Sequence, residues 1–412
     1  MDKLLVIGAG IGQIPIILKA KRRGIHVSVV TLPGNLPGID LADDVFYCDI
    51  YDRESIVEWA KNHGITAVIS DQNDIMNPTV AFVAEKLGLP GNRFDQVMAY
   101  CNKNAYRDNC DILGIPAPKH IAVDNANFSI SSFDCPLPWI VKPADSQSSV
   151  GVQKITKNEE LKPALDVALS HSKTHSAIVE EFFTGKEIVC EGFINKGKYY
   201  LLAFADRKYF DLNGLMIPSQ TIFPSLVKQE LLDRVLECEQ RMASYISPSF
   251  AIVHSEYLVN EQSGEIRVVE SALRGGGVYI SSHLIPFATG IDINEILLDK
   301  VMGIEVDVER VLSRRKDAAS GYVCFYLPEG IVKRVYGIAE LQNLSFVKMV
   351  CLDMIQEGQK TEPMLHKGLR KGPILVTGES REDLEKNIRI VQEILSIKVE
   401  SPEGELKGII WE

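Results

Sequence analysis

The sequence predicts an α/β fold at its N-terminus followed by a mixed α+β region, and three observations lead to this fold class. Over the first hundred residues, short apolar runs alternate with segments whose apolar residues recur at helical spacing. From about residue 139, strands linked mostly by glycine-containing turns replace this alternation. The last hundred residues mix short strands with one long final helix. A chain of 412 residues has room for two to three domains.

The N-terminal alternation predicts a parallel sheet, because strand–helix alternation is typical of βαβ units. Ligands of such sheets bind beyond the carboxyl ends of the strands. Residues 71–74 (Asp-Gln-Asn-Asp) follow a strand there, so this edge is a candidate substrate surface. The expected strands are residues 4–7, 27–30 and 67–69, and the expected helices are 11–21, 54–62 and 80–87.

The rest of the chain predicts mainly strands. The small, polar, glycine-tipped segment 145–151 is expected to be a mobile loop, since it offers few groups to bury. The expected strands are 139–142, 177–181, 187–193, 199–205, 251–259, 266–271, 321–326 and 374–377, with helices at 227–246 and 381–395.

Charge and apolar patterning exclude several classes of protein. Lys and Arg number 44 against 55 Asp and Glu, a net charge of −11, which argues against general nucleic-acid binding. No stretch approaches about 20 uninterrupted apolar residues, so we expect no membrane-spanning helix. The first residues lack the features of a signal peptide. Eight cysteines without a CxxC pair favour a reduced, cytoplasmic protein.

Glycines at 8, 10 and 12 follow the first strand and open a helix, which is the start of a dinucleotide-binding fingerprint. Gln13 stands where the next glycine is needed, and the second strand ends without the expected acidic residue. A turn that packs the helix tightly on the sheet is therefore favoured over NAD binding. The helix N-terminus still offers N–H groups to a substrate anion.

Two glutamates on a predicted hairpin are the main chemical signal. A three-residue loop 262–264, with Gly264 in the left-handed conformation, is a common connection. This register places Glu256 opposite Glu270, and Leu258 opposite Val268. Opposed carboxylates lie about 5 Å apart at Cβ and repel, unless a cation such as Mg²⁺ or Mn²⁺ lies between them. A register slipped by one residue, with both glutamates solvated, is an equal alternative from spacing alone.

Arg274 follows Glu270 by four residues and leads into three glycines, 275–277. A fixed guanidinium beside metal-bound phosphates stabilises charge that develops in a transition state. Three consecutive glycines let the backbone approach a ligand closely, which argues against a plain surface arginine.

Six segments, taken in order, resemble the motifs of the ATP-grasp superfamily of carboxylate–amine ligases. They are residues 102–103 (Asn-Lys), 140–143 (Ile-Val-Lys-Pro), 145–152, 179–187, 255–257 (Ser-Glu-Tyr) and 269–274 (Val-Glu-Ser-Ala-Leu-Arg). The resemblance implies ATP and Mg²⁺ (or Mn²⁺) as cofactors. It assigns Lys103 and Lys142 to the phosphates, Ser146, Ser148, Ser149 and Gly151 to the phosphate-covering loop, Glu180, Glu181 and Phe183 to adenine, Glu187 to ribose, Glu256 and Glu270 to the metal, and Arg274 to the acyl phosphate.

One departure from the family pattern narrows the substrate. Ala272 stands where the family usually has a metal-binding Asn, so one of the two usual magnesium ions is held differently or more weakly. His254 lies opposite Ala272 in the hairpin register, where it could act through water or touch substrate. A packed or surface histidine is favoured, because imidazole is a poor Mg²⁺ ligand. The Ala variant resembles the branch of L-amino-acid ligases, which favours a small amino acid as substrate.

The resemblance implies three domains: a pre-ATP-grasp α/β domain (1–98), an ATP-grasp domain (99–303) and a small β-rich C-terminal domain (304–412). The expected activity is an ADP-forming ligation of a small carboxylate to an amine. The alternatives are activation of bicarbonate or formate, as in carbamoyl-phosphate synthase and purine-pathway relatives, and a regulatory nucleotide-binding protein with decayed catalysis. The expected partners are small molecules, with no nucleic acid and no membrane, in a possible homodimer. Two weaker candidate clusters are His366, Arg370 and Lys371, for which a solvated loop is the favoured alternative, and Asp206, Arg207 and Lys208.

Overall fold

The N-terminal region forms a parallel sheet of order β3-β2-β1-β4, as the sequence predicts. The computed structural model describes residues 2–124, 133–146, 150–212, 216–364 and 367–412. The strands are β1 (Lys3–Ile7), β2 (His26–Thr31), β3 (Asp44–Tyr47) and β4 (Ala67–Ile69), and the helices are η1 (Ile11–Gln13), α1 (Ile14–Arg22), α2 (Arg53–Asn62), η2 (Asp74–Met76) and α3 (Asn77–Leu87).

Strand β3 is missing from the sequence prediction. It is a half-exposed edge strand, so it lacks the continuous apolar run that marks the buried strands β1, β2 and β4. The central strands carry fully buried side chains such as Leu5, Ile7 and Val30, which pack against α2. This packing fixes the sheet whose carboxyl edge faces the rest of the molecule.

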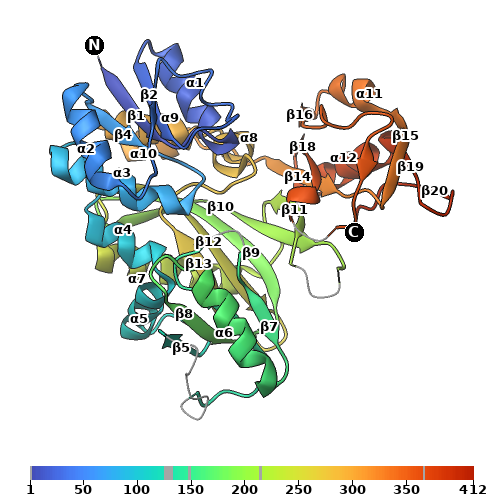
Figure 1. The fold of residues 1–412 in the computed structure, drawn as a ribbon, viewed down its shortest axis with the longest axis horizontal. Coiled ribbons are helices and arrows are strands. Elements are labelled where there is room, and N and C mark those ends of the chain that lie inside the picture. The colour runs from blue at the N-terminus through green and yellow to red at the C-terminus, as the bar shows by residue number, and fades with distance from the viewer. Residues whose placement is uncertain (1, 125–132, 147–149, 213–215, 365–366) are drawn as a thin grey trace.

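A small antiparallel sheet of order β5-β8-β6-β7 follows, and it lies below the N-terminal region in Figure 1. Helix α6 covers one face with buried residues at helical spacing, including Leu161, Ala164 and Leu165. The elements are α4 (Phe94–Cys101), α5 (Lys103–Leu113), β5 (His120–Val123), β6 (Trp139–Pro143), β7 (Gln153–Ile155), η4 (Asn158–Glu160), α6 (Leu161–Ser170) and β8 (Ala177–Glu181).

The largest sheet has the order β13-β12-β9-β10-β11-β14-β18-β16 and carries most of the candidate site. Helix α7 packs on it through Leu231, Val235 and Met242. Its strands are β9 (Lys186–Asn195), β10 (Lys198–Tyr209), β11 (Pro218–Phe223), β12 (Phe250–Asn260), β13 (Glu265–Ala272), β14 (Ala319–Phe325), β16 (Val347–Val350) and β18 (Lys371–Gly378), and the neighbouring helices are α7 (Gln229–Ile246), η5 (Ile280–Leu284), α8 (Ile285–Thr289), α9 (Ile293–Val301) and α10 (Val308–Leu312).

The C-terminal lobe lies at the right of Figure 1 and adds a small sheet of order β17-β15-β19-β20. Its elements are β15 (Gly330–Tyr336), α11 (Ile338–Gln342), β17 (Lys360–Thr361), η6 (Lys367–Leu369), α12 (Arg381–Ile394), β19 (Ser396–Glu400) and β20 (Leu406–Lys407). Strands β14, β16 and β18 of this lobe continue the large sheet, so the sheet crosses residue 303. The domain boundaries at 98 and 303 stay predictions.

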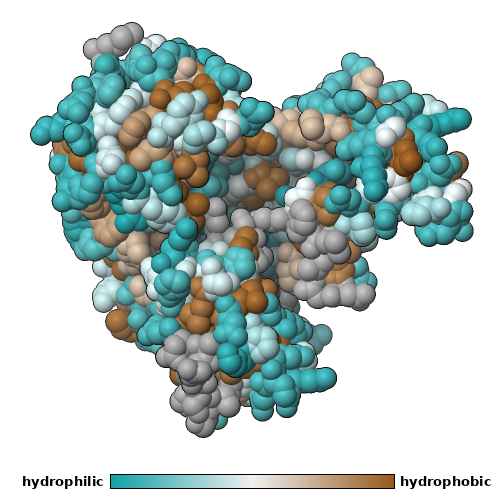
Figure 2. All heavy atoms as spheres, in the orientation of Figure 1, coloured by the Kyte–Doolittle hydropathy of each residue, from teal (hydrophilic) through white to brown (hydrophobic). Residues whose placement is uncertain are grey.

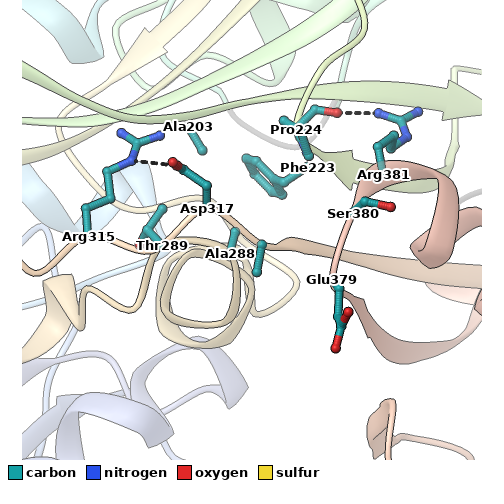
Figure 3. Close-up of a pocket in the computed structure, with 11 residues that line it drawn as sticks. Ala203, Phe223, Pro224, Ala288, Thr289, Arg315, Asp317, Glu379, Ser380 and Arg381 are labelled. Carbon is teal, nitrogen blue, oxygen red and sulfur yellow. Dashed lines mark hydrogen bonds and ion pairs between the residues drawn. The ribbon is translucent and has the colours of Figure 1, made fainter.

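Arg381 ties the C-terminal lobe to the central sheet. Its guanidinium lies 3.0 Å from Asp206 and donates to the carbonyl of Pro224, and Arg381 and Pro224 both line a cavity of about 270 Å³. Figure 3 shows this cavity, with the Arg315–Asp317 ion pair at its other wall. In Figure 2 the surface is hollowed between the N-terminal body and this lobe. No helix in the described part of the chain is long and apolar enough to span a bilayer.

Candidate active site

Lys142, Glu180 and Arg107 form a buried cluster with one more positive than negative charge. Lys142 Nζ lies 2.7 Å from Glu180 Oε2, and Arg107 Nε lies 2.8 Å from Glu180 Oε1. The antiparallel register of β6 and β8 places Lys142 and Glu180 as diagonal neighbours on one face. Burial alone raises the pKa of Glu180, but Arg107 and Lys142 outweigh it and lower the pKa to about 2. The carboxylate of Glu180 is therefore ionised at ordinary pH, while burial lowers the pKa of Lys142 against the opposing effect of Glu180.

Arg107 is a site residue that the sequence analysis missed. It follows Lys103 by four residues on α5, so both side chains lie on one face of the helix. Its Nη2 also donates to the carbonyl of Val269 at 2.7 Å, which links the small sheet to the β12–β13 hairpin. The sequence signal for Arg107 is its spacing of four residues after Lys103. This spacing indicates a site residue only when Glu180 is known to lie against the same face of α5.

Glu187, Arg207 and Glu256 form a second buried cluster, with the opposite excess charge. One guanidinium serves both carboxylates: Arg207 Nη1 lies 2.8 Å from Glu187 Oε1 and also contacts Glu256. The hydroxyl of Tyr209 donates to Glu187. Burial, and then the charge of Glu256, raise the pKa of Glu187 to about 7. Arg207 and His254 outweigh burial at Glu256 and hold its pKa well below the usual range. The three side chains therefore comprise two carboxylates and one guanidinium, so a further cation would complete their charge balance.

The β12–β13 register confirms the predicted pairing of Glu256 with Glu270, and of His254 with Ala272. The predicted pairing of Leu258 with Val268 is wrong, because Leu258 pairs with Arg267. The loop has four residues, 261–264, since Asn260 pairs with Glu265, and Gly264 adopts the predicted left-handed conformation (φ +73°). A register shift between residues 256 and 257 leaves one residue unpaired on β13 and restores the predicted alignment at the glutamates.

Glu270 lies beside Lys103, the residue that begins α5. Lys103 Nζ is 3.7 Å from Glu270 Oε2 and donates to the carbonyl of Ser146 at 2.6 Å. The two hairpin glutamates offer carboxylate oxygens alone, and among the described residues no group of three or more His, Cys, Asp or Glu side chains is arranged to hold a metal ion. A pair of carboxylates fits Mg²⁺, which takes its other ligands from water and phosphate.

Arg274 is fixed by the N-terminal domain. Its Nε and Nη2 atoms each lie 2.9 Å from a carboxylate oxygen of Asp74, which is a bidentate ion pair. The following glycine run is fixed in the same way, because Asp71 accepts from the N–H of Gly275 at 2.7 Å and from Ser281 at 2.9 Å. The strand edge that the sequence marked as a substrate surface thus positions the candidate catalytic arginine.

His254 is packed within the site, which is one of the two positions favoured from the sequence. Its Nδ1 contacts Glu191, which is fully buried on β9, and its Nε2 lies 3.2 Å from Glu256. The N–H of Gly276 lies 3.4 Å from the other oxygen of Glu191. Burial opposes the charged imidazole, but Glu191 raises the pKa of His254. Nothing in the sequence marked Glu191, since its partners lie about 60 or more residues further along the chain.

The remaining nucleotide candidates lie around the small sheet. The carboxylate of Glu181 accepts from the N–H of Lys119 at 3.2 Å, on the side of β8 away from Lys142. Phe183 lies under the guanidinium of Arg267, 4.8 Å from its ring centroid. Ser146 donates to the carbonyl of Val150, and Gly151 has φ +73°. Ser148 and Ser149 lie outside the described residues.

The weaker clusters separate into different places. Arg207 belongs to the site, whereas the adjacent Asp206 points to the C-terminal lobe and pairs with Arg381. Arg370 donates to the carbonyl of Pro218 at 2.7 Å. His366 lies outside the described residues. At the N-terminal glycines, the Gln13 side chain bridges the N–H of Gly10 and the carbonyl of Asp71.

Comparisons with known proteins identify a domain family for part of the chain. Residues 135–282 match the family model of the ATP-grasp domain. A D-alanine–D-alanine ligase of Azobacteroides pseudotrichonymphae is 25% identical over 177 residues, which cover 41% of this chain and 53% of the relative. D-alanine–D-alanine ligase A of Escherichia coli K12 is 32% identical over 121 residues, 27% of this chain and 32% of the relative. The chain thus spans about a third to a half of the length of these relatives.

Solved structures extend the likeness of fold to nearly the whole chain. The L-amino acid ligase of Bacillus licheniformis superimposes with a TM-score of 0.80 at 21% identity, covering 96% of this chain and 98% of that one. Phosphoribosylglycinamide synthetase of Anaerococcus prevotii superimposes with a TM-score of 0.74 at 18% identity, covering 96% and 99%. Residues 135–282 therefore match the ATP-grasp domain, and nearly the whole chain has a fold similar to that of these two structures.

Proposed function

We propose that the protein is an ATP- and Mg²⁺-dependent ligase that joins a small carboxylate, such as an amino acid, to an amine and forms ADP and phosphate. The observation that carries this proposal is the pairing of Glu256 with Glu270 next to Arg274, which Asp74 holds in place. The resemblance to D-alanine–D-alanine and L-amino acid ligases supports the choice of an amino acid as substrate.

The residues divide into groups by charge. The excess positive charge of Lys142 and Arg107 complements phosphate, and Lys103 adds a further ammonium group at the Glu270 end. Glu256 and Glu270 would hold Mg²⁺, which neutralises phosphate charge when bound. Arg207 would act as the counter-ion of Glu187 and Glu256 in the absence of other cations.

The proposed chemistry has two steps. An oxygen of the substrate carboxylate attacks the γ-phosphorus of ATP, and ADP leaves, which gives an acyl phosphate. The amine then attacks the acyl carbon, loses a proton, and phosphate leaves to give the amide. Charge develops on the acyl oxygen in the second step, and the Arg274 guanidinium is the fixed cation available to stabilise it.

The test is a phosphate-release screen over pairs of amino acids and other small carboxylates and amines, followed by analysis of the nucleotide product. With an ¹⁸O-labelled carboxylate, one labelled oxygen should pass to phosphate. AMP and pyrophosphate with unlabelled phosphate would exclude the acyl-phosphate route.

Arg274→Lys gives a second test on a single residue. The lysine keeps the charge but cannot make the two-pronged pair with Asp74. We expect turnover to fall by roughly ten- to a hundredfold, the value of one or two charge-assisted hydrogen bonds, while ATP affinity measured by calorimetry changes little. A parallel fall in both quantities would place Arg274 on the nucleotide instead.

A further inference from the structure

Glu239 is a buried carboxyl group on α7 that belongs to neither charge cluster. It is 2% exposed and lies among the residues through which α7 packs on the large sheet. Its Oε1 accepts from the hydroxyl of Tyr257 at 2.7 Å, and Ser255 forms a second side-chain hydrogen bond with it. Burial raises the pKa of Glu239 to about 7, against the opposing effect of these two hydrogen bonds. A carboxyl group is costly to bury, so the two hydrogen bonds are what it contributes here beyond an apolar side chain.

The two partners of Glu239 are the residues on either side of Glu256 on β12. Side chains alternate along a strand, so Tyr257 and Ser255 point to the face of the hairpin that packs on α7, and Glu256 points to the opposite face. Ser255 Oγ also lies 2.8 Å from Oγ of Ser271, its register partner on β13. Tyr257 and both serines are buried. A continuous chain of hydrogen bonds therefore joins α7 to both strands of the hairpin.

This chain of hydrogen bonds spans the bulge of the hairpin. The register shift comes immediately before Tyr257 on β12, and Val269 is the residue left unpaired on β13. Tyr257 lies on the loop side of the shift and the Ser255–Ser271 pair lies on the other side, so one carboxyl group of α7 holds both. The carbonyl of Val269 accepts from Arg107 at 2.7 Å. The bulge is thus held through its extra residue and, separately, from the α7 face.

The bulge determines which face of the hairpin Glu270 occupies. If the register set by the four-residue loop continued without the bulge, Glu256 would pair with Val269, and Ser255 would pair with Glu270. Paired residues share a face of the sheet, and a slip of one residue moves a side chain to the other face. Glu270 would then lie on the α7 face, away from Glu256. With the bulge in place, both carboxylates lie on the face of the candidate site.

We propose that Glu239 is a positioning residue for the metal site: by holding Tyr257 and Ser255 on either side of the register shift, it keeps the two hairpin glutamates on one face. The inference rests on the proposed function, which assigns the metal ion to Glu256 and Glu270. Glu239 acts through these neighbours and not as a metal ligand. Buried hydrogen bonds are directional and select one register, whereas apolar contacts with α7 are not directional.

The test removes the parts of this hydrogen-bond chain one at a time. Tyr257→Phe removes only the hydroxyl, and Glu239→Leu removes both hydrogen bonds at similar volume. Glu239→Gln keeps an oxygen that accepts from Tyr257, and its amide N–H can donate to Ser255. Affinity for Mn²⁺ is measured by calorimetry in the presence of ADP. We expect this affinity to fall by roughly three- to tenfold in Tyr257→Phe and by roughly ten- to a hundredfold in Glu239→Leu, and to stay within about threefold of the wild type in Glu239→Gln.

Tyr199→Phe is the matched control. It removes a buried hydroxyl of the same core that is bonded to Cys190 on β9, so it should lower the melting temperature to a similar extent as Tyr257→Phe and leave Mn²⁺ affinity unchanged. Hydrogen exchange gives a readout that needs neither metal nor substrate. In Glu239→Leu and Tyr257→Phe, the backbone amides of residues 255–258 and 268–271 should exchange faster than in the wild type or the control. Tyr257→Phe keeps the test decisive if Glu239→Leu does not fold.

The outcomes separate this inference from the ligase proposal. Mn²⁺ affinity that depends on Glu239 as expected, with no turnover for any substrate pair, would refute the ligase and support the positioning role. Turnover together with equal Mn²⁺ affinities in the wild type, Glu239→Leu and Tyr257→Phe would refute the positioning role and leave the ligase. Equal losses in Glu239→Gln and Glu239→Leu, or the same loss in Tyr199→Phe, would also overturn it, because a general loss of packing would then explain the data. Absence of Mn²⁺ binding in the wild type would overturn both proposals.

Discussion

The site contains two buried charge clusters, one around Glu180 and one around Arg207, and they combine cations and carboxylates in opposite ratios. Around Glu180, two cations share one carboxylate, and the pKa of that carboxylate falls to about 2. Around Arg207, two carboxylates share one guanidinium, and the pKa of Glu187 rises to about 7. Both clusters are buried to a similar degree, so the difference comes from the count of charges and not from desolvation.

This comparison shows what each cluster lacks. Burying a charge without full compensation is costly, and each cluster leaves one charge uncompensated. The Glu180 cluster is completed by an anion and the Glu187–Glu256 cluster by a cation. A metal-bound polyphosphate carries both, which is why the two clusters together support the proposed nucleotide site better than either does alone.

The largest effect on turnover is expected from changing Glu270, the hairpin carboxylate that lies beside Lys103 and not beside Arg207. Glu270→Gln should lower turnover by at least about a hundredfold, the loss typical when a charge-stabilising group is removed from a site. The melting temperature should stay the same or rise slightly, since opposed like charges repel. Turnover with a productive substrate pair and a melting curve check this. Glu265→Gln, at the far end of the same strand, is the matched control, and equal losses in both variants would contradict the assignment.

The pH dependence of stability should distinguish the two clusters by sign. The folded-state pKa of Glu187 is raised, so protonation of Glu187 stabilises the folded state. This contribution is fully present below about pH 4.5 and is lost as the pH rises through about 7. Glu187→Gln should therefore gain stability relative to the wild type across this window, by roughly 3 kcal/mol for a shift of this size. Urea unfolding from pH 4 to pH 8 measures the difference.

Glu180→Gln is the opposite case in the same experiment. Its folded-state pKa is lowered to about 2, so its contribution is present above about 4.5 and lost as the pH falls towards 2. The variant should be less stable than the wild type by a constant amount between pH 5 and pH 8. Parallel curves for the two variants would show that the clusters do not differ in charge balance.

A smaller effect is expected at the positive cluster. Lys142→Ala removes one of the two cations that balance Glu180, and ATP affinity should fall by roughly ten- to a hundredfold, the value of one charge-assisted hydrogen bond. Calorimetry with ATP and Mg²⁺ measures this change. Lys162→Ala, which removes an exposed lysine of α6 paired with Asp166, should leave the affinity unaltered, and equal affinities in all three proteins would exclude Lys142 from the nucleotide site.

The smallest effect concerns the hairpin that carries the glutamates. Gly264 has φ +73° and open space around its Cα, so Gly264→Ala should cost about 1 kcal/mol of stability through backbone strain alone. Turnover should be unchanged, because the bulge lies between the loop and Glu270. A loss of turnover would show that the loop, rather than the bulge, sets the register of the carboxylates.

The hairpin also illustrates how far the sequence could predict the site. Local patterning identified the strands, the left-handed Gly264 and the pairing of Glu256 with Glu270, but the loop length was short by one residue. The error did not reach the glutamates because a bulge on β13 compensates for it. A bulge of this kind depends on packing from both sides of the sheet, and alternation of apolar residues does not reveal it.

Contacts between distant segments were the part that could not be predicted. Arg274 and Asp74 lie 200 residues apart, and each had been marked for a different reason. Arg207 stood out only as part of a charged triplet, and its neighbour Asp206 pairs with Arg381 of the C-terminal lobe instead. Charged side chains carry no periodic signal of their own, so their partners become visible only when the sheets and the N-terminal domain are placed together.

The large sheet that runs past residue 303 determines where the chain can be cut. Strand β11 pairs with β14, and Asp206, which is buried, pairs with Arg381 of the last long helix. A fragment ending at residue 303 would expose the hydrogen-bonding edge of β11 and leave Asp206 without its arginine. Exposed edges of this kind recruit other chains into aggregates. Expression of the central region that carries the candidate site, for crystallisation or screening, therefore requires the C-terminal lobe as well.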